Sequence, residues 1–381
     1  MNPVFALTLS EIGQWKPQLE DLARNCAEPN VFFEPWMLLP ALKELADDRV
    51  EMILVHEDGR IAGMLPVERT RRFRGLPLVT LRTWQHLHCF LGTPLVRKGS
   101  EKLFFQRLLE WAGSTERREV LLELRGFGET GTLWPAMLEV LTQRGHRHFP
   151  GRPQSRAMLA ARCGGQEYIE RSLGAKRRKE LRRQERRLGE LGTLICEHLG
   201  REDDVDGWIE DFLRIEASGW KGREGTALGL REGEQRYFRR VMHNAFQAGQ
   251  LMMLRLRLNG ETISAQVNFR SGTGAFAFKV AFDERYARYS PGVLLELENI
   301  RLQLDGVGDQ AEWMDSCSQP GPSLIETIWR ERRTIHTLYM ATGHSLSRPV
   351  MVMLRNLVAL RAGNARRQDS GSGLPAYPRS G

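Results

Sequence analysis

Three observations predict an α/β fold in which one unit of strands and helices is used twice. Two pairs of strand-like segments are each joined by a tight-turn dipeptide, Asp58-Gly59 in one pair and Asn259-Gly260 in the other. Each pair is followed by a further strand, an apolar helix pattern and a short strand. The two copies lie about 200 residues apart, which indicates an internal repeat of mixed sheets flanked by helices.

The elements of the first copy follow from local residue preferences. Asp-Gly supplies the positive φ angles of a hairpin turn between strands at 52–56 and 60–67. A strand-like run at 76–81, a helical apolar pattern at 101–112 and the strand EVLLEL at 119–124 complete this copy.

The second copy repeats that order. Strands at 251–258 and 261–269 flank the Asn-Gly turn, and a third strand is expected at 275–282. The loop DERYARYSPG then leads to a helix at 293–304 and a short strand at 311–315.

The composition excludes several classes of protein. The chain has 381 residues, 41% of them hydrophobic and 27% charged, as in a globular protein with real cores. Its five scattered cysteines contain no CxxC pair, so neither a disulfide framework nor a metal site is expected. No signal-peptide pattern and no apolar run of roughly 20 residues is present, so we expect a cytoplasmic protein without membrane insertion.

A basic stretch, AKRRKELRRQERRLGELG at 175–192, lies between the copies and carries eight Lys or Arg residues and three Glu. Helical spacing places Leu181, Leu188 and Leu191 on one edge, with Arg178 and Arg182 roughly opposite. We expect the leucine edge to pack against the rest of the protein. The basic face has three open interpretations: contact with an anionic cofactor or acceptor, a solvated or ion-paired surface, or nucleic-acid binding.

These patterns predict four segments of the chain. They are an N-terminal domain at 1–165, the basic inter-domain helix at 166–200, a C-terminal domain at 201–362 and a disordered, Pro/Gly-rich tail at 363–381.

The turn YSPG, at 289–292, lies between a predicted strand and a predicted helix. Unpaired N–H groups and the helix dipole make such a turn suitable for phosphate oxygens, and Pro291 suits the first helical turn. A helix start with no ligand is the alternative interpretation.

Three stretches together resemble one family: the basic stretch, IEASGWKGREGTAL at 215–228, and FKVAFDERYARYSPGVLLELENI at 278–300. The sequence is similar to the GNAT-related acetyltransferases associated with bacterial cellulose and exopolysaccharide synthesis, which share their architecture with the Fem aminoacyltransferases. The resemblance covers roughly residues 30 to 340. It implies two GNAT-like folds in tandem, the second of which binds acyl-CoA.

The resemblance also implies how the cofactor is held. The backbone N–H groups of Ser290, Gly292 and Val293 would contact the CoA pyrophosphate, with Arg285 and Arg288 adding charge. A backbone N–H near Phe278, Lys279 or Val280 would polarise the thioester carbonyl. The commoner glycine-rich phosphate signature of GNAT proteins is absent, and the SPG form is shared with Fem-like relatives.

Other residues are expected to act on the substrates. Asp315 is the predicted base, or else it holds the following loop; Tyr339 protonates the thiolate, or else lies in the core. Trp220 and Lys221 form a loop of the acceptor site, or else the tryptophan packs beneath that loop. If the basic face of the 175–192 helix contacts an anionic cofactor or acceptor, Arg178 and Arg182 are the residues that face the ligand. Lys279 and Asp283 form an ion pair or contact the ligand. His86, His88, Cys89 and Cys317 are interpreted as buried residues, because no second ligand cluster or nearby base supports metal or nucleophile chemistry.

The function predicted from this resemblance is N-acyl transfer from acyl-CoA, with acetyl-CoA the expected donor, to a small amine or amino sugar. Polysaccharide synthesis is the expected setting, and direct transfer in a ternary complex the expected route. The alternatives are a Fem-like transferase that uses aminoacyl-tRNA and a non-catalytic GNAT-fold module of a polysaccharide-synthesis assembly. The acceptor, the acyl group and the oligomeric state stay open.

Overall fold

The computed structural model describes residues 4–8, 10–114, 118–225, 227–306, 311–318 and 324–356. The predicted tail at 363–381 lies outside these described residues. Within them, no helix combines the length and the apolar character needed to span a membrane.

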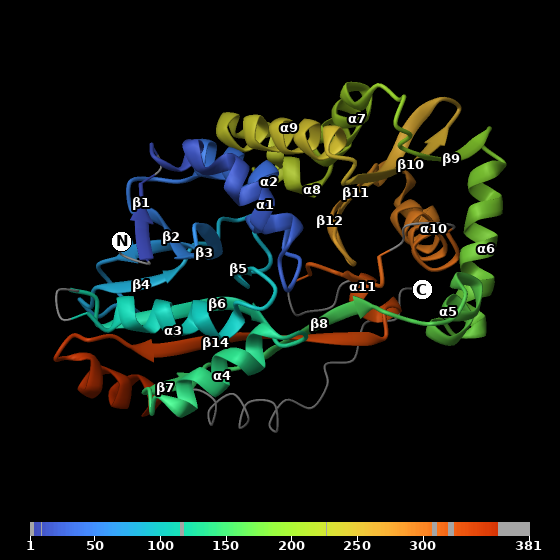
Figure 1. Ribbon diagram of the computed structural model, residues 1–381. Coiled ribbons are helices and arrows are strands. Elements are labelled where there is room, and N and C mark those ends of the chain that lie inside the picture. The colour runs from blue at the N-terminus through green and yellow to red at the C-terminus, as the bar shows by residue number, and fades with distance from the viewer. Residues whose placement is uncertain are drawn as a thin grey trace.

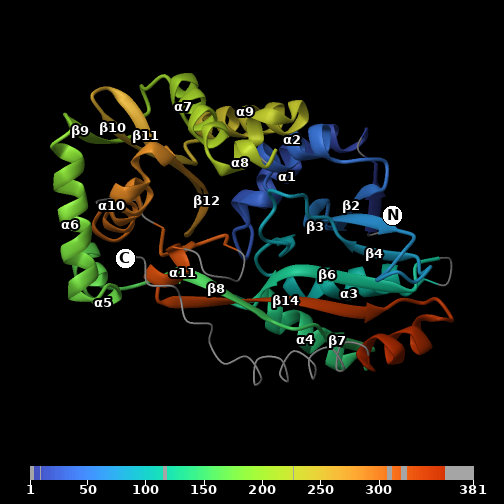
Figure 2. The same ribbon diagram turned by 180° about the vertical axis from the view of Figure 1, so that it is seen from behind.

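A mixed β-sheet runs through the whole molecule, with helices packed along it (Figures 1 and 2). Its strands are β1 (Val4–Leu7), β2 (Val50–Glu57), β3 (Arg60–Thr70), β4 (Thr80–Thr83), β5 (Leu95–Val96), β6 (Leu121–Gly128), β7 (His148–Pro150), β8 (Gln154–Leu159), β9 (Leu194–His198), β10 (Leu251–Leu258), β11 (Glu261–Ser271), β12 (Gly274–Phe282), β13 (Trp313–Asp315) and β14 (Glu331–Ala341).

The two halves of the sheet have equivalent strands in the same order, counted outward from the centre of the sheet. The strand order reads β1-β2-β3-β4-β6-β14-β8-β13-β12-β11-β10-β9, with β5 paired to β3 and β7 to β14. The pairs β4/β6 and β12/β13 are parallel and occupy equivalent places in the two halves, whereas the other pairings are antiparallel. The predicted repeat of one unit is therefore confirmed.

Each half of the sheet is completed by a strand from the other part of the chain. β14, from the C-terminal segment, pairs with β6 of the first unit, and β8, which precedes the second unit, pairs with β13. β14 and β8 also pair with each other over five residues, which joins the units into one sheet. In Figure 1 these two strands run together beneath both units.

Both predicted hairpins are present, and their turns have the expected backbone. Asp58 and Gly59 have φ of 48° and 77°, and Asn259 and Gly260 have φ of 50° and 82°. Two successive positive φ angles match the right-handed twist of the flanking strands, and Asn, Asp and Gly tolerate them best.

The helices cover the faces of this sheet. The α-helices are α1 (Lys16–Arg24), α2 (Pro35–Leu45), α3 (Glu101–Ala112), α4 (Leu133–Gln143), α5 (Gly165–Ser172), α6 (Ala175–Gly189), α7 (Val205–Ser218), α8 (Trp220–Arg223), α9 (Glu232–Gln247), α10 (Pro291–Asp305) and α11 (Leu324–Ile328). The short 3-10 helices are η1 (Ile12–Trp15), η2 (Val31–Phe33), η3 (Leu228–Leu230) and η4 (Glu284–Tyr289).

The two units share a continuous core. α2 of the first unit packs on α9 of the second, and Phe32 of η2 makes edge-to-face contact with Phe276 of β12. The buried Glu34 accepts hydrogen bonds from Ser271 and Gln250 of the second unit. Because the units bury apolar and polar groups against one another, their relative position is fixed by packing.

The basic stretch forms α6, which lies at the outer edge of the second unit beside α10 (Figure 1). Leu181 and Leu188 are buried as predicted, against α10 and η4. Leu191 is 46% exposed, so the prediction that it docks is wrong: the helix ends at Gly189 and the chain turns before that residue.

Candidate active site

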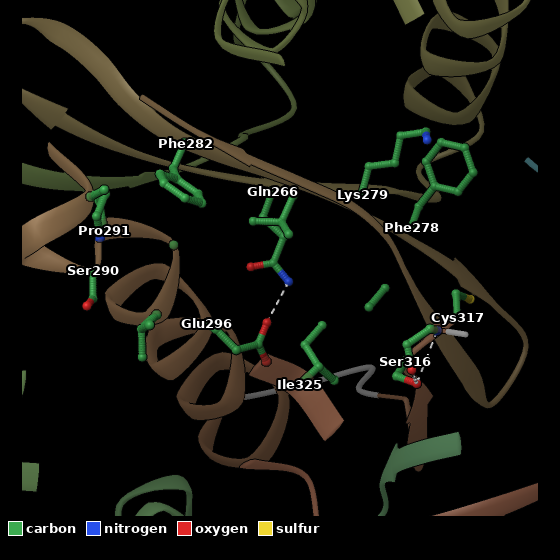
Figure 3. Close-up of a pocket in the computed structure, with 16 residues that line it drawn as sticks. Gln266, Phe278, Lys279, Phe282, Ser290, Pro291, Glu296, Ser316, Cys317 and Ile325 are labelled. Atoms are coloured by element: carbon green, nitrogen blue, oxygen red, sulfur yellow. Dashed lines mark hydrogen bonds between the residues drawn. The ribbon is translucent and has the colours of Figure 1, made fainter. Parts of the chain in front are cut away.

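The parallel strands β12 and β13 separate at the centre of the second unit. They pair only from Gly274 to Phe276 and from Trp313 to Asp315, and β12 then continues to Phe282 without β13, paired with β11 on its other side. A cavity of about 460 Å³ opens where they part, and we call it the wedge cavity. It is lined by Gln266, Ala277, Phe278, Lys279, Val280, Phe282, Ala287, Ser290, Pro291, Gly292, Val293, Glu296, Ser316, Cys317, Ser318 and Ile325 (Figure 3).

A β-bulge bends β12 at this opening. Val267 of β11 lies opposite Lys279 and Asn268 lies opposite Ala277, so Phe278 is the extra residue of β12. Bulges interrupt the ladder and re-aim the backbone, and they are common next to active sites. The predicted backbone donors of the segment 278–280 therefore lie at the wall of the wedge cavity.

The turn before α10 closes the other end of the wedge cavity. Ser290 has a left-handed backbone with φ of 54°, a costly conformation for a residue with a side chain. Its N–H donates to Ala287 O, and the Val293 N–H donates to Ser290 O, at 3.0 and 2.9 Å. Among the described residues, the N–H of Gly292 has no acceptor, so it is the donor that the turn leaves for a ligand.

Gly292 also leaves room beside β12. A Cβ at this position would lie 3.3 Å from a ring carbon of Phe282 on β12. Phe282 and Val280 are 38% and 39% exposed, which leaves apolar surface on the open strand. The passage between the start of α10 and β12 is therefore narrow and apolar.

The two predicted arginines lie outside the lining of the wedge cavity. Arg285 forms ion pairs with Asp283 and Glu261, and its hydrogen bonds to these carboxylates raise its pKa further. Arg288 is exposed and places its guanidinium 4.7 Å from the centroid of the Tyr289 ring. The ammonium of Lys279, which does line the cavity, lies 5.4 Å from the centroid of the Phe278 ring.

A buried carboxylate, that of Glu296, lies on the inner face of α10 and was not anticipated from the sequence. Gln266 Nε2 and Trp329 Nε1 donate to it at 2.9 and 2.8 Å, and Asn299 Nδ2 donates at 3.2 Å. Burial raises the pKa of Glu296 to about 7, against the opposing effect of these hydrogen bonds. Among the described residues that line the wedge cavity, Glu296 is the one carboxylic acid.

Gln266 has an unused acceptor beside Glu296. Its Nε2 is oriented by Glu296, while its buried Oε1 has no hydrogen-bond partner within the described part of the chain. Figure 3 shows the Gln266 amide and the Glu296 carboxylate joined by this hydrogen bond. A buried orphan acceptor is costly unless a ligand or water donates to it.

Asp315 is fully buried and does not line the wedge cavity. Its Oδ2 accepts from Arg156 of β8 at 2.5 Å and from Arg333 of β14 at 2.8 Å, and its Oδ1 accepts from the Cys317 N–H. Burial opposes ionisation, but the two guanidiniums outweigh it and hold the pKa of Asp315 below its ordinary value. This environment suits a structural anion that ties β13 to β8 and β14, rather than a group that exchanges protons with a substrate.

Tyr339, Arg178 and Arg182 do not line the wedge cavity. The Tyr339 hydroxyl accepts from Arg74, and its ring stacks on Phe149 in the first unit. Arg178 donates to the carbonyls of the segment that ends α5, at 2.6 and 2.7 Å, and Arg182 is exposed. The backbone of Trp220 and Lys221 forms the first half of α8, and their side chains lie outside the description.

A second cavity, of about 370 Å³, lies where the two units meet, and we call it the arginine cavity. It is lined by Gln85, His86, Leu87, Cys89, Phe90, Arg125, Gly126, Arg152, Gln154, Arg156, Cys317, Ser318, Ile335, His336 and Thr337. Cys317 and Ser318 line both cavities, so the two cavities adjoin at these residues. The histidine-rich segment near residue 86 thus contributes to a cavity that sequence patterns did not predict.

Comparison with known proteins supports the predicted fold. Residues 175–306 match a family described as an acetyltransferase (GNAT) domain. No match is found among curated proteins.

Solved structures resemble the chain along most of its length. FemX is 11% identical with a TM-score of 0.53, and the match covers 89% of this chain and 98% of that one. A conserved protein of unknown function from Bacteroides thetaiotaomicron is 12% identical with a TM-score of 0.54, covering 90% and 100%. The C-terminal domain of a candidate lysylphosphatidylglycerol synthetase from Agrobacterium fabrum is 12% identical with a TM-score of 0.51, covering 89% and 95%.

These likenesses agree with the strand order. The predicted tandem of GNAT-like folds is confirmed, and the segment matched as an acetyltransferase domain contains β12, the turn at Ser290 and α10.

Proposed function

We propose that this protein transfers an acyl group from acyl-CoA, with acetyl-CoA the expected donor, to the nitrogen of a small amine or amino sugar. The observation that carries the proposal is the wedge cavity, which opens between β12 and β13 at the start of α10. The match of residues 175–306 to an acetyltransferase (GNAT) domain supports it.

The residues of the wedge cavity fit such a donor. The Gly292 N–H and the positive end of the α10 dipole suit a phosphate group at one end. The apolar faces of Val280 and Phe282 suit an alkyl chain, and the orphan Gln266 Oε1 would accept from an amide N–H. When bound, acyl-CoA supplies an activated thioester.

Within this arrangement Glu296 would accept the proton that the amine loses. The amine nitrogen forms a bond to the acyl carbon, the carbon–sulfur bond breaks, and the electron pair leaves with the thiolate, which takes a proton from solvent. A pKa near 7 suits a base that works at neutral pH, and the three hydrogen bonds fix its orientation. A backbone N–H of the bulged segment 278–280 would polarise the carbonyl.

Binding of CoA to a variant with a narrowed passage tests this proposal. A Gly292→Val side chain would press on Phe282, so we expect the affinity for CoA, measured by calorimetry, to fall about tenfold or more. Gly207→Val, in the first turn of α7 and away from both cavities, is the matched control. Equal affinity of the two variants would exclude this turn as the CoA site.

An aminoacyl-tRNA donor is the second candidate, favoured by the exposed face of α6. Lys176, Arg177, Lys179, Arg182 and Arg187 are exposed there. Binding of charged tRNA that weakens steeply between two salt concentrations, and that is lost when three of these residues become Gln, would support this donor. If CoA binds and tRNA does not, the first candidate holds.

A non-catalytic role in a polysaccharide-synthesis assembly, the remaining alternative from the sequence, makes a different prediction. Such a module would fold and associate with its assembly but transfer no acyl group to any amine. Release of free thiol from acetyl-CoA in the presence of an amine panel separates the two roles.

A further inference from the structure

The arginine cavity carries a positive charge that the proposed acyl transfer does not use. Arg125, Arg152 and Arg156 line it, and within the described lining there is no aspartate or glutamate. We infer that this cavity binds an oxyanion group, a carboxylate or a phosphate, that the acceptor amine carries. The inference rests on the proposed function and narrows its acceptor to amines with a negative charge.

The three arginines occupy different depths of the cavity. Arg156 is 5% exposed and Arg125 is half-buried, whereas Arg152 is exposed at the rim. The Arg156 guanidinium donates to Asp315 and to the Phe90 carbonyl, but its buried Nε has no partner in the described structure. A buried guanidinium N–H without an acceptor is costly, and an oxyanion in the adjoining cavity would satisfy it.

Two carboxylates, those of Asp315 and Glu123, lie close to these arginines, but they do not balance the positive charge. Asp315 is shared between Arg156 and Arg333, so a single negative charge faces two buried positive charges. Glu123, two residues before Arg125 on β6, is buried, and that burial raises its pKa despite the nearby arginines. The lining of the cavity therefore keeps an excess of positive charge, which an anionic ligand would neutralise.

His86 adds a neutral donor to the same cavity. Its Nδ1 accepts from the His88 N–H at 3.3 Å, which places the ring proton on Nε2. Burial, with a smaller effect from the charge of Lys279, lowers the pKa of His86 to about 3, so the ring stays neutral at physiological pH. A neutral imidazole donates to an oxyanion without adding a titrating charge.

The position of the arginine cavity links the anion to the reaction. Cys317 and Ser318 form a wall shared with the wedge cavity. Cys317 is held in a left-handed backbone with φ of 51° by its N–H bond to Asp315. An acceptor anchored by its anion in the arginine cavity would extend its amine past these shared residues into the wedge cavity, where the acyl group would lie.

Pairs of amines that differ in the anionic group test the inference. Two pairs differ by a carboxylate: alanine with ethylamine, and lysine with cadaverine. The third pair, glucosamine 6-phosphate with glucosamine, differs by a phosphate, so the two kinds of anion are tested separately. One readout is thiol release from acetyl-CoA, and the other is the shift in Tm that each amine causes without acetyl-CoA. The second readout needs no catalysis, so failure of the acyl-transfer proposal would not hide the result.

We expect at least one anionic amine to exceed its neutral partner about tenfold in kcat/KM and to raise Tm more. Arg125→Gln and Arg152→Gln should each remove most of that preference, whereas Arg201→Gln, at an exposed site outside both cavities, should keep it. Arg152→Gln, at the exposed rim, covers the case in which Arg125→Gln fails to fold.

Three results would count against the inference. One is equal Tm shifts and equal turnover for the charged and neutral members of every pair. Another is a preference for the anion that survives in both cavity variants as it does in Arg201→Gln. The third is a panel in which CoA binds but no anionic amine shifts Tm or is acylated.

Discussion

Glu296 sets the expected pH dependence of the proposed reaction. As a base it acts only when ionised, so kcat/KM should fall as the pH drops through its pKa of about 7. Glu296→Gln should lower the rate by about 10²- to 10⁴-fold and remove that limb of the profile. Steady-state rates of thiol release between pH 5.5 and 8.5 measure both effects.

The matched control for this experiment is Glu298→Gln, on the same helix. Glu298 pairs with Arg301 and lines neither cavity, so its variant should keep the rate and the pH profile. A normal rate with Glu296→Gln would remove Glu296 from the role of base.

Asp315 is expected to matter for stability. Asp315→Asn would leave the buried Arg156 and Arg333 without a negative partner, which should cost about 3–5 kcal/mol in the free energy of unfolding. Because the pKa of Asp315 is lowered in the folded state, its contribution is present above the ordinary pKa and is lost as the pH falls through the folded value.

Urea unfolding at neutral pH measures this cost. Asp48→Asn, at an exposed position, is the control and should change the free energy of unfolding by less than about 0.5 kcal/mol. Equal stability of the two variants would contradict a structural role for Asp315.

Local chemistry made the hairpins and α3 predictable, but it did not reveal Glu296. Asp-Gly and Asn-Gly determine the turn conformation from a few neighbouring residues alone. The helix α3 likewise has the predicted bounds of 101–112. Glu296 lies in the sequence VLLELENI, where an acid on an apolar helix resembles an exposed residue. The sequence did contain one signal of this buried acid. Two amide residues, Gln266 and Asn268, lie in the buried part of β11, where they can pair with polar groups on the facing helix.

Helix α6 packs on the second unit through two buried leucines, Leu181 and Leu188. Leu188→Ala should destabilise the protein by about 2–5 kcal/mol, because Leu188 is fully buried against the second unit. Leu191→Ala is the natural control, since this residue is largely exposed and should cost little. Thermal unfolding of both variants checks the difference, and similar losses would mean that α6 docks differently.

The turn between β12 and α10 shows which part of the site was predictable. YSPG indicated a phosphate-suited turn, and Ser290, Gly292 and Val293 do line the wedge cavity. The partners of Asp315 and the position of Tyr339 were not predictable, because both depend on where β14 pairs. A strand carries no local mark of a partner about 200 residues away.

The exchanged strands predict that the chain segment 1–165 is not an independent folding unit. Expressed alone, it would leave the edge of β6 without β14 and the core under α2 without α9, so it should be aggregated or sensitive to protease. Co-expression with residues 166–381 should restore a soluble complex. Gel filtration and limited proteolysis check both outcomes, and a stable monomeric 1–165 fragment would contradict them.

The same exchange has a consequence for the order of events during synthesis. The ribosome makes residues 121–128 long before residues 331–341, yet these two segments form neighbouring strands. The N-terminal half must therefore wait, with an open sheet edge, until almost the whole chain has emerged. A chain that stalls late in translation would present that edge to other molecules, which makes this protein dependent on completed synthesis, or on a chaperone that covers the edge.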